Sequence, residues 1–170
     1  DIEQPQALTT LDFERFYRRE FAAVVRAAVP IVSGDLRAAE DAAQDAFVAA
    51  EARWPKIVGY DRPDLWVRRV AVNNAISHRR KHRRELYELG DDRGSTDDHL
   101  VEADQQVLDA IGRLSRRQSQ LVVLVYFSDL SLDDAAKALG IGYESARTHH
   151  NRALAKLERD LAGGVEHHDR

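Results

Sequence analysis

The sequence contains no cysteine and no methionine, and its 170 residues include only four prolines, nine glycines and 7% aromatic residues. The absence of cysteine excludes disulfide bonds, thiolate zinc sites, iron–sulfur clusters and cysteine nucleophiles. No apolar run approaches the ~20 residues that span a bilayer, and the first residues lack the basic and then apolar profile of a signal peptide. These absences predict a cytoplasmic protein without direct membrane insertion, made of one domain or two small ones.

Charge is distributed unevenly along the chain. The formal net charge is −4, which argues weakly against nucleic acid as a partner, because attraction to phosphates supplies most non-specific affinity. Residues 65–84, however, contain seven Lys or Arg residues and no acid, whereas residues 85–109 contain nine acids and one base. Such an abrupt reversal indicates two separate functional surfaces.

Apolar residues recur at helical spacing in the first half of the chain. They predict helices over about residues 11–32 and 36–53, with Ser33-Gly34-Asp35 between them and Pro55 closing the second. Pro63 stands where a first helical turn accepts proline, and it opens a third helix that continues into the basic run. Together these three helices predict one helical unit.

Residues 88–98 are polar, contain glycine and show no periodicity, which is typical of a flexible linker. Beyond them, four helices are predicted at about residues 100–114, 116–127, 131–139 and 143–161, and no segment alternates long enough to predict a strand. The predicted fold is all-α, with two small helical domains joined by a flexible acidic linker. We place the first domain at residues 8–84, the linker at 85–104, the second domain at 105–163 and a tail at 164–170.

The clearest local motif is a helix-turn-helix pattern near the end of the chain. Ala136 lets two helices approach closely and Gly140 permits the turn, while Leu139, Ile141 and Ala146 supply apolar packing at the corner. In this geometry the second helix enters the major groove of DNA. Its candidate DNA-binding residues are Tyr143, Glu144, Ser145, Arg147, Thr148, Asn151 and Arg152. The alternative is a plain helical hairpin.

Three aromatic residues, Trp54, Tyr60 and Trp66, flank the loop that precedes the basic run. Aromatic rings beside cations are what single-stranded bases stack on, which favours nucleic-acid binding. Two alternatives remain open. The cations can be a solvated helix end, and the tryptophans can belong to the core.

No catalytic constellation is present in the sequence. The histidine pairs at 149–150 and 167–168 lack metal-ligand spacing, and phosphate-loop, dinucleotide and serine-hydrolase motifs are missing. Carboxylates on the exposed face of the second helix are more typical of a solvated or protein-facing surface than of a metal site. We therefore expect a protein that is not an enzyme and uses neither a metal nor a cofactor.

Three stretches resemble the extracytoplasmic-function group of sigma-70-type sigma factors, the initiation subunits of bacterial RNA polymerase. Residues 39–47, AEDAAQDAF, resemble the core helix of sigma region 2. Residues 64–77, DLWVRRVAVNNAIS, followed by the basic run, resemble the next segment of that region, and residues 114–154 resemble region 4. The three stretches occur in the family's order and span nearly the whole chain.

The resemblance implies a division of labour between the two domains. Region 2 would bind the clamp helices of the largest polymerase subunit through Asp41, Gln44 and Asp45. It would also capture the −10 element and an extruded base, at an unstacking cost of a few kcal/mol, with Arg68 and Arg69 on phosphates and Asn73 near the base. The full −10 set is Trp54, Tyr60, Trp66, Arg68, Arg69, Asn73, Arg79 and Arg80. Region 4 would read the −35 element through the seven residues 143–152 named above and meet the flap of the second-largest subunit.

The resemblance further implies promoter DNA as a partner and an anti-sigma factor, which can itself be membrane-bound, that holds the protein inactive until a signal releases it to the nucleoid. His149 and His150 depart from the family pattern, since Arg and Leu are usual there. Histidine, unlike arginine, does not carry a permanent charge, so neither residue is counted as a phosphate-binding cation. Two other functions are therefore kept open: a stand-alone helix-turn-helix regulator, and a degenerate sigma factor that acts as a protein-binding decoy.

Overall fold

The structure, a computed structural model, describes residues 4–89 and 102–165 of the chain. All regular secondary structure in these residues is helical, which confirms the predicted all-α class with two helical domains. The helices are α1 (Gln4–Ala28), α2 (Leu36–Glu51), α3 (Trp54–Ile57), α4 (Pro63–Leu89), α5 (Glu102–Gly112), α6 (Arg116–Tyr126), α7 (Leu132–Leu139) and α8 (Tyr143–Val165).

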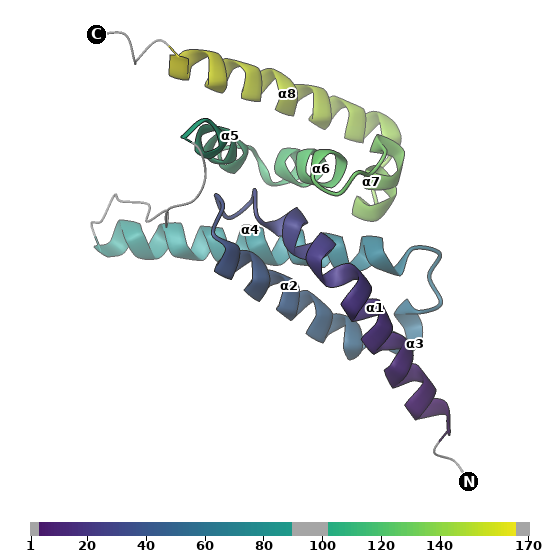
Figure 1. Cartoon of the computed structure of the whole chain (residues 1–170). Helices are drawn as coiled ribbons and strands as arrows, with labels where there is room; N and C mark the ends of the chain where they lie inside the picture. The colour runs from purple at the N-terminus through teal and green to yellow at the C-terminus, as the bar shows by residue number, and fades with distance from the viewer. Residues whose placement is uncertain (1–3, 90–101, 166–170) are drawn as a thin grey trace.

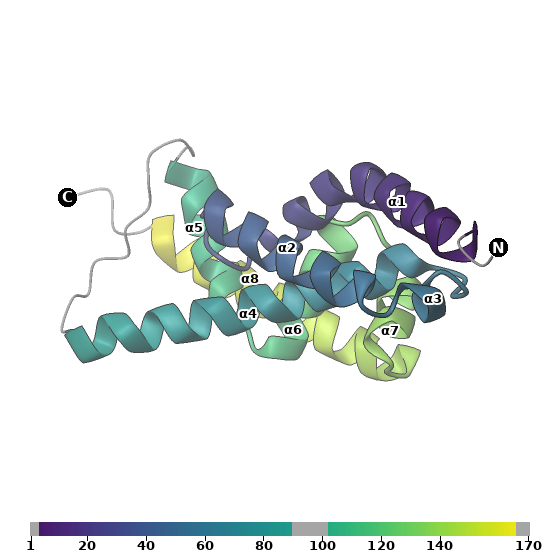
Figure 2. The same ribbon diagram turned by 90° about the horizontal axis from the view of Figure 1, so that it is seen from below.

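The helices form two stacked layers (Figure 1). We call α1–α4 the N-terminal layer and α5–α8 the C-terminal layer. Helix α4 lies between the two, because it packs on α1 and α2 on one side and on α6 and α7 on the other. Figure 2, the view from below, shows α4 running the length of the molecule, with its C-terminal end extending past α2.

The start of α2 follows its sequence signals closely. Helix α1 ends at Ala28, two residues before Pro30, and the turn that follows places Ser33 and Gly34 at φ of 55° and 90°. Asp35 then caps α2, because its carboxylate accepts a hydrogen bond of 3.0 Å from the backbone N–H of Ala38. The predicted start at residue 36 is confirmed.

Helix α1 begins at Gln4 and ends at Ala28 instead of spanning the predicted residues 11–32. Two further helical features differ from the prediction. The segment after α2 forms the short helix α3, with Pro55 in its first turn, where proline costs no hydrogen bond. Helix α4 also continues to Leu89, and Lys81 supports this extension by pairing with Glu85 at 3.9 Å one turn later. The predicted linker at 85–104 is therefore helical at both ends, and its middle, residues 90–101, lies outside the described residues.

Small residues on α2 allow the helices of the N-terminal layer to approach closely. Five alanines of α2 are completely buried, at positions 39, 42, 43, 46 and 50. Phe47 fills the remaining space and is only 2% exposed. Four aromatic rings of α1 surround it, with ring centroids 4.8 to 6.5 Å from its own: Phe13, Phe16, Tyr17 and Phe21.

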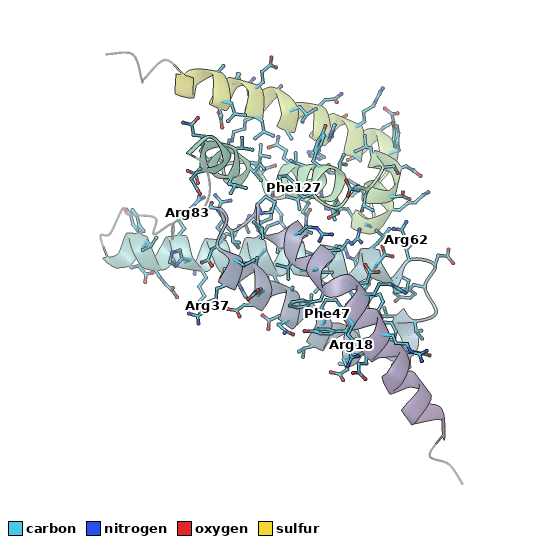
Figure 3. All side chains as sticks on the ribbon, viewed as in Figure 1. Arg18, Arg37, Phe47, Arg62, Arg83 and Phe127 are labelled. Atoms are coloured by element: carbon cyan, nitrogen blue, oxygen red, sulfur yellow. The ribbon has the colours of Figure 1, made fainter. Side chains whose placement is uncertain are left out.

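The buried core continues from one layer into the other. Val67 and Ala71 of α4 belong to the same apolar cluster as Leu121 and Val123 of α6. Figure 3 shows Phe127 in the space between the layers, where it packs against this cluster. The two layers therefore share apolar contacts in addition to the polar ones described below.

Phe47 provides a direct test of this packing. Replacing Phe47 with alanine removes a buried aromatic side chain, and we expect the free energy of unfolding to fall by about 3–5 kcal/mol. Urea denaturation followed by circular dichroism measures the change. The control is Val48→Ala, because the neighbouring Val48 is 65% exposed. Equal losses in the two variants would contradict the arrangement of α2.

Candidate nucleic-acid interface

The predicted polymerase-binding residues Asp41, Gln44 and Asp45 are all exposed on the outer face of α2. Gln44 Nε2 donates a hydrogen bond of 3.0 Å to the hydroxyl of Tyr17, and an oxygen of Asp45 lies 3.5 Å from Nε2 of His78. Val48 is exposed beside them, an apolar contribution that the sequence analysis missed. A face that combines carboxylates with an apolar side chain suits a protein partner better than phosphates.

Helices α7 and α8 form the predicted helix-turn-helix. Gly140 ends α7 in the left-handed conformation, at φ 64° and ψ 37°, where a side chain would be strained. Ser131 caps the start of α7 by accepting a hydrogen bond of 3.0 Å from the N–H of Asp134. The Asp134 carboxylate accepts from the Ser131 hydroxyl rather than from its backbone, so a full capping box does not form.

The candidate DNA-binding residues of α8 share one exposed face. All seven are exposed: Tyr143, Glu144, Ser145, Arg147, Thr148, Asn151 and Arg152. Ala146 and Ala153 lie one heptad apart on the opposite side and are completely buried. On the exposed face, Arg147 pairs with Glu144 at 2.6 Å. Polar contacts on this face, from Arg147 to the Glu144 carboxylate and from Thr148 to the Glu144 backbone oxygen, stay within α8.

His150 does not belong to that face. Its ring stacks on Tyr126 of α6, with centroids 5.7 Å apart and planes 16° apart, and His149 is half-buried. The departure of His150 from the family pattern therefore affects the packing of α8 on α6 rather than the exposed face.

Trp54 requires a correction. We predicted it among the residues that hold the −10 element, but it is only 4% exposed. Its ring packs against Phe13 and Phe16, with centroids 5.3 and 4.9 Å away. Trp54 therefore follows the core alternative and cannot stack on a base in this arrangement. Tyr60 is 39% exposed and Trp66 is half-buried.

Arg68 also differs from its predicted role on phosphates. Its Nη2 lies 3.2 Å from Glu20 and 3.8 Å from Asp64, and its Nη1 donates to the backbone oxygen of Ser128 at 3.1 Å. The side chain is only 13% exposed. Two carboxylates already compensate its charge, so Arg68 holds α1, α4 and the α6–α7 turn together.

Asp64, one of these carboxylates, lies in the first turn of α4. Burial is the largest influence and raises the pKa of Asp64, but hydrogen bonds from Arg62 and the charges of Arg62 and Arg68 outweigh it. The pKa therefore ends below its ordinary value. The two hydrogen bonds from Arg62 measure 3.0 and 2.9 Å. At neutral pH the carboxylate is ionised and the network around Arg68 is intact.

Asn73 and Arg69 contact the C-terminal layer directly. The side-chain oxygen of Asn73 accepts hydrogen bonds from Arg116 at 3.2 Å and from Gln120 at 2.5 Å. Arg69 Nη1 donates to the backbone oxygen of Ala138 at 3.2 Å. We call these contacts, together with that between Arg68 and Ser128, the seam. The sequence does not reveal Arg116 and Gln120 as contact residues, since no local pattern says which polar side chains meet across two domains.

Arg79 and Arg80, the last of the predicted −10 residues, lie on α4 beyond the seam. Arg79 is half-buried and Arg80 is exposed. In the part of the chain that the structure describes, no group of three or more His, Asp or Glu side chains is placed to hold a metal ion. No helix of this part is long and apolar enough to cross a membrane.

Comparison with known proteins identifies the two layers. Residues 16–85 match the family model described as Sigma-70 region 2, and residues 104–157 match the model for Sigma-70, region 4. The RNA polymerase sigma-E factor of Streptomyces avermitilis is 31% identical over 156 residues, which cover 89% of this chain and 86% of that protein. The chain belongs to the sigma-70 family.

Its relatives place this sigma factor in the extracytoplasmic-function group. The sigma-E factor of Streptomyces coelicolor is 30% identical over 158 residues, covering 89% of this chain and 86% of that protein. Sigma factor SigZ of Bacillus subtilis is 26% identical, covering 73% of each chain. Sigma factors act in transcription initiation without being enzymes.

Solved sigma-factor structures share the two-layered arrangement. RpoE of Bartonella quintana, in complex with the anti-sigma factor NepR, has a TM-score of 0.69 and is 25% identical, covering 94% of this chain and 99% of that one. CnrH, in complex with the cytosolic domain of CnrY, has a TM-score of 0.60 and is 23% identical, covering 89% and 88%. The second likeness concerns the fold alone.

The seam makes a specific prediction for Asn73. Replacing Asn73 with leucine leaves the Gln120 amide, buried at 3% exposure, without its acceptor, which costs about 1–3 kcal/mol. We expect the layers to separate in part and the radius of gyration in small-angle X-ray scattering to increase.

The matched control is Asn73→Asp, because a carboxylate still accepts from both Arg116 and Gln120. Its scattering curve should match that of the parent chain. An Asn73→Leu variant that scatters like the parent would contradict the role of the seam.

Proposed function

We propose that this sigma factor binds core RNA polymerase through α2, holds the −10 element on α4 and reads the −35 element with α8. The observation that carries the proposal is the outer face of α8, where all seven candidate residues are exposed. A helix that follows a tight helix-turn-helix corner and keeps such a face free has the geometry that enters a major groove.

The outer face of α2 is the proposed contact with the clamp helices of the largest polymerase subunit. Asp41, Gln44 and Asp45 supply its charge and hydrogen-bonding groups, and Val48 supplies apolar area. Helix α2 lies on the side of α4 away from the C-terminal layer (Figure 1), so α2 can bind the polymerase while α8 binds DNA. We place the contact with the flap of the second-largest subunit on the C-terminal layer.

The proposed −10 site consists of Tyr60, Trp66, Arg69, Asn73, Arg79 and Arg80. Trp54 and Arg68 contribute to it only indirectly. Trp54 packs in the core beneath the site, and Arg68 is ion-paired and fixes α4 in place. In the structure, Arg69 and Asn73 are engaged with the C-terminal layer. Binding of the −10 element therefore requires the two layers to separate.

An anti-sigma factor is the proposed inhibitor. The support is the likeness to RpoE, whose structure was solved with the anti-sigma factor NepR. An anti-sigma factor that binds both layers at once would keep the seam closed, and Asn73 would stay in contact with α6. Such inhibition needs no chemical change in the sigma factor itself.

Run-off transcription with bacterial core polymerase on a genomic promoter library tests the function. We expect transcripts that start at discrete sites. Arg147→Ala should lower their yield by about 5- to 150-fold, because a base contact of this kind contributes ~1–3 kcal/mol. The control is Arg159→Ala, an exposed arginine on the same helix outside the proposed face.

The outcomes separate the alternatives. Binding to core polymerase without any transcript would favour a decoy. Tight binding to duplex DNA in the absence of polymerase, without binding to core, would favour a stand-alone regulator.

A further inference from the structure

A small pocket lies where α4 passes the turn between α5 and α6. Its volume is about 180 Å³, and both layers contribute to its walls. Five arginines line it: Arg79, Arg80 and Arg83 from α4, and Arg113 and Arg116 from the C-terminal layer. Pockets for organic ligands usually measure ~300–1,000 Å³. This one has room for phosphate groups but not for a whole nucleotide.

Positive charge in the pocket is only partly compensated. Arg113 lies 3.5 Å from Asp160, and Arg116 binds the neutral amide of Asn73. Among the described residues, no carboxylate is within ion-pair distance of Arg79, Arg80 or Arg83, although Asp109 is close enough to attract Arg79. Burial, followed by repulsion from Arg83 and Arg113, lowers the pKa of Arg79 to about 10. Arg79 is still protonated at neutral pH, and burial together with the neighbouring arginines makes its positive charge energetically unfavourable.

The backbone around Gly112 accommodates this charge. A Cβ atom at position 112 would lie 2.5 Å from Nη2 of Arg79 and 2.7 Å from its Cζ. Only glycine therefore lets the guanidinium lie against the turn. Helix α6 begins beside it, with Ser115 as the N-cap, and the positive end of the helix dipole lies at the same wall.

We propose that this pocket binds the phosphate groups of a small polyphosphate anion, either inorganic or the tail of a nucleotide, and thereby clamps the two layers together. Arginine forks match phosphate oxygens in geometry as well as charge. DNA is the other source of phosphates on α4, but Arg113 and Arg116 complete the pocket only while the layers are closed. The consequence for transcription rests on the proposed function, whereas binding of the anion does not.

Isothermal titration calorimetry of the full chain with inorganic tripolyphosphate tests the binding, with sulfate as a comparison anion. Arg83→Gln should weaken tripolyphosphate binding by about tenfold, as expected for the loss of one charge-assisted contact. The control is Arg37→Gln, which removes the same charge from an exposed site. Figure 3 shows Arg37 on the far side of the N-terminal layer and Arg83 on the side of α5.

Gly112→Ala provides a second variant that keeps every charge. It displaces the Arg79 guanidinium, and we expect weaker binding with an unchanged circular dichroism spectrum. If Arg83→Gln and Arg37→Gln lowered the affinity for tripolyphosphate equally, the loss would reflect net charge alone, and the proposal would be overturned. Binding of sulfate as tight as that of tripolyphosphate would also overturn it.

Small-angle X-ray scattering tests closure of the two layers by the anion in the absence of polymerase. A negative result there is therefore distinguishable from failure of the proposed function. Tripolyphosphate should return the Asn73→Leu variant to the radius of gyration of the parent chain. A single-stranded oligonucleotide of six thymidines should not, because it binds α4 in the open form. Closure by the oligonucleotide and not by tripolyphosphate would assign the pocket to DNA and contradict the proposal.

Discussion

The structure depends on one helix, α4, that packs against both layers of the molecule at once. Helix α4 buries Val67, Ala71 and Ala75 in the apolar core. Asn73 and Asn74 show the constraint most directly. Asn74 donates to the backbone oxygen of Ala42 on α2 at 3.3 Å, and Asn73 accepts from α6. Any movement of the C-terminal layer changes the surroundings of Asn73 while Asn74 continues to fix α4 to α2.

The seam is weak enough to open when a partner binds. It consists of four hydrogen bonds, each with a net contribution of about 0.5–1.5 kcal/mol, and the apolar contacts around Phe127 lie beside it. A partner that binds with micromolar affinity releases ~8 kcal/mol, which exceeds the sum of these polar contacts. Opening would also expose the apolar side chains that α4 and α6 share, which the partner has to cover, while the packing of α1, α2 and α4 on one another remains. The arrangement is therefore consistent with a sigma factor whose two layers are in contact in the inactive form and separate in the active form.

Local signals in the sequence predicted local structure well. Asp35, Pro63 and Gly140 mark helix ends for reasons that depend only on their neighbours, and Ala146 reports a buried position one turn into α8. The exposed face of α8 follows from the same periodicity. The extension of α4 to Leu89 was not predicted, because the pairing of Lys81 with Glu85 one turn later supports a helix that a shift in composition does not reveal.

The roles of Trp54 and Arg68 depended on tertiary contacts. Trp54 is buried by Phe13 and Phe16, about 40 positions earlier in the chain, and Arg68 is paired by Glu20. The seam and the arginine pocket were equally beyond the sequence. Their residues lie on either side of the linker, and no local pattern specifies how the two layers meet.

The most direct test of the closed arrangement is a distance measurement between the layers. Because the chain contains no cysteine, spin labels can be attached at Glu51→Cys on α2 and Glu158→Cys on α8 without side reactions, since both residues are exposed. Electron paramagnetic resonance should give one narrow distance distribution for the free chain and a longer distance when it is bound to core polymerase and promoter DNA. The same distance in both states would contradict the account.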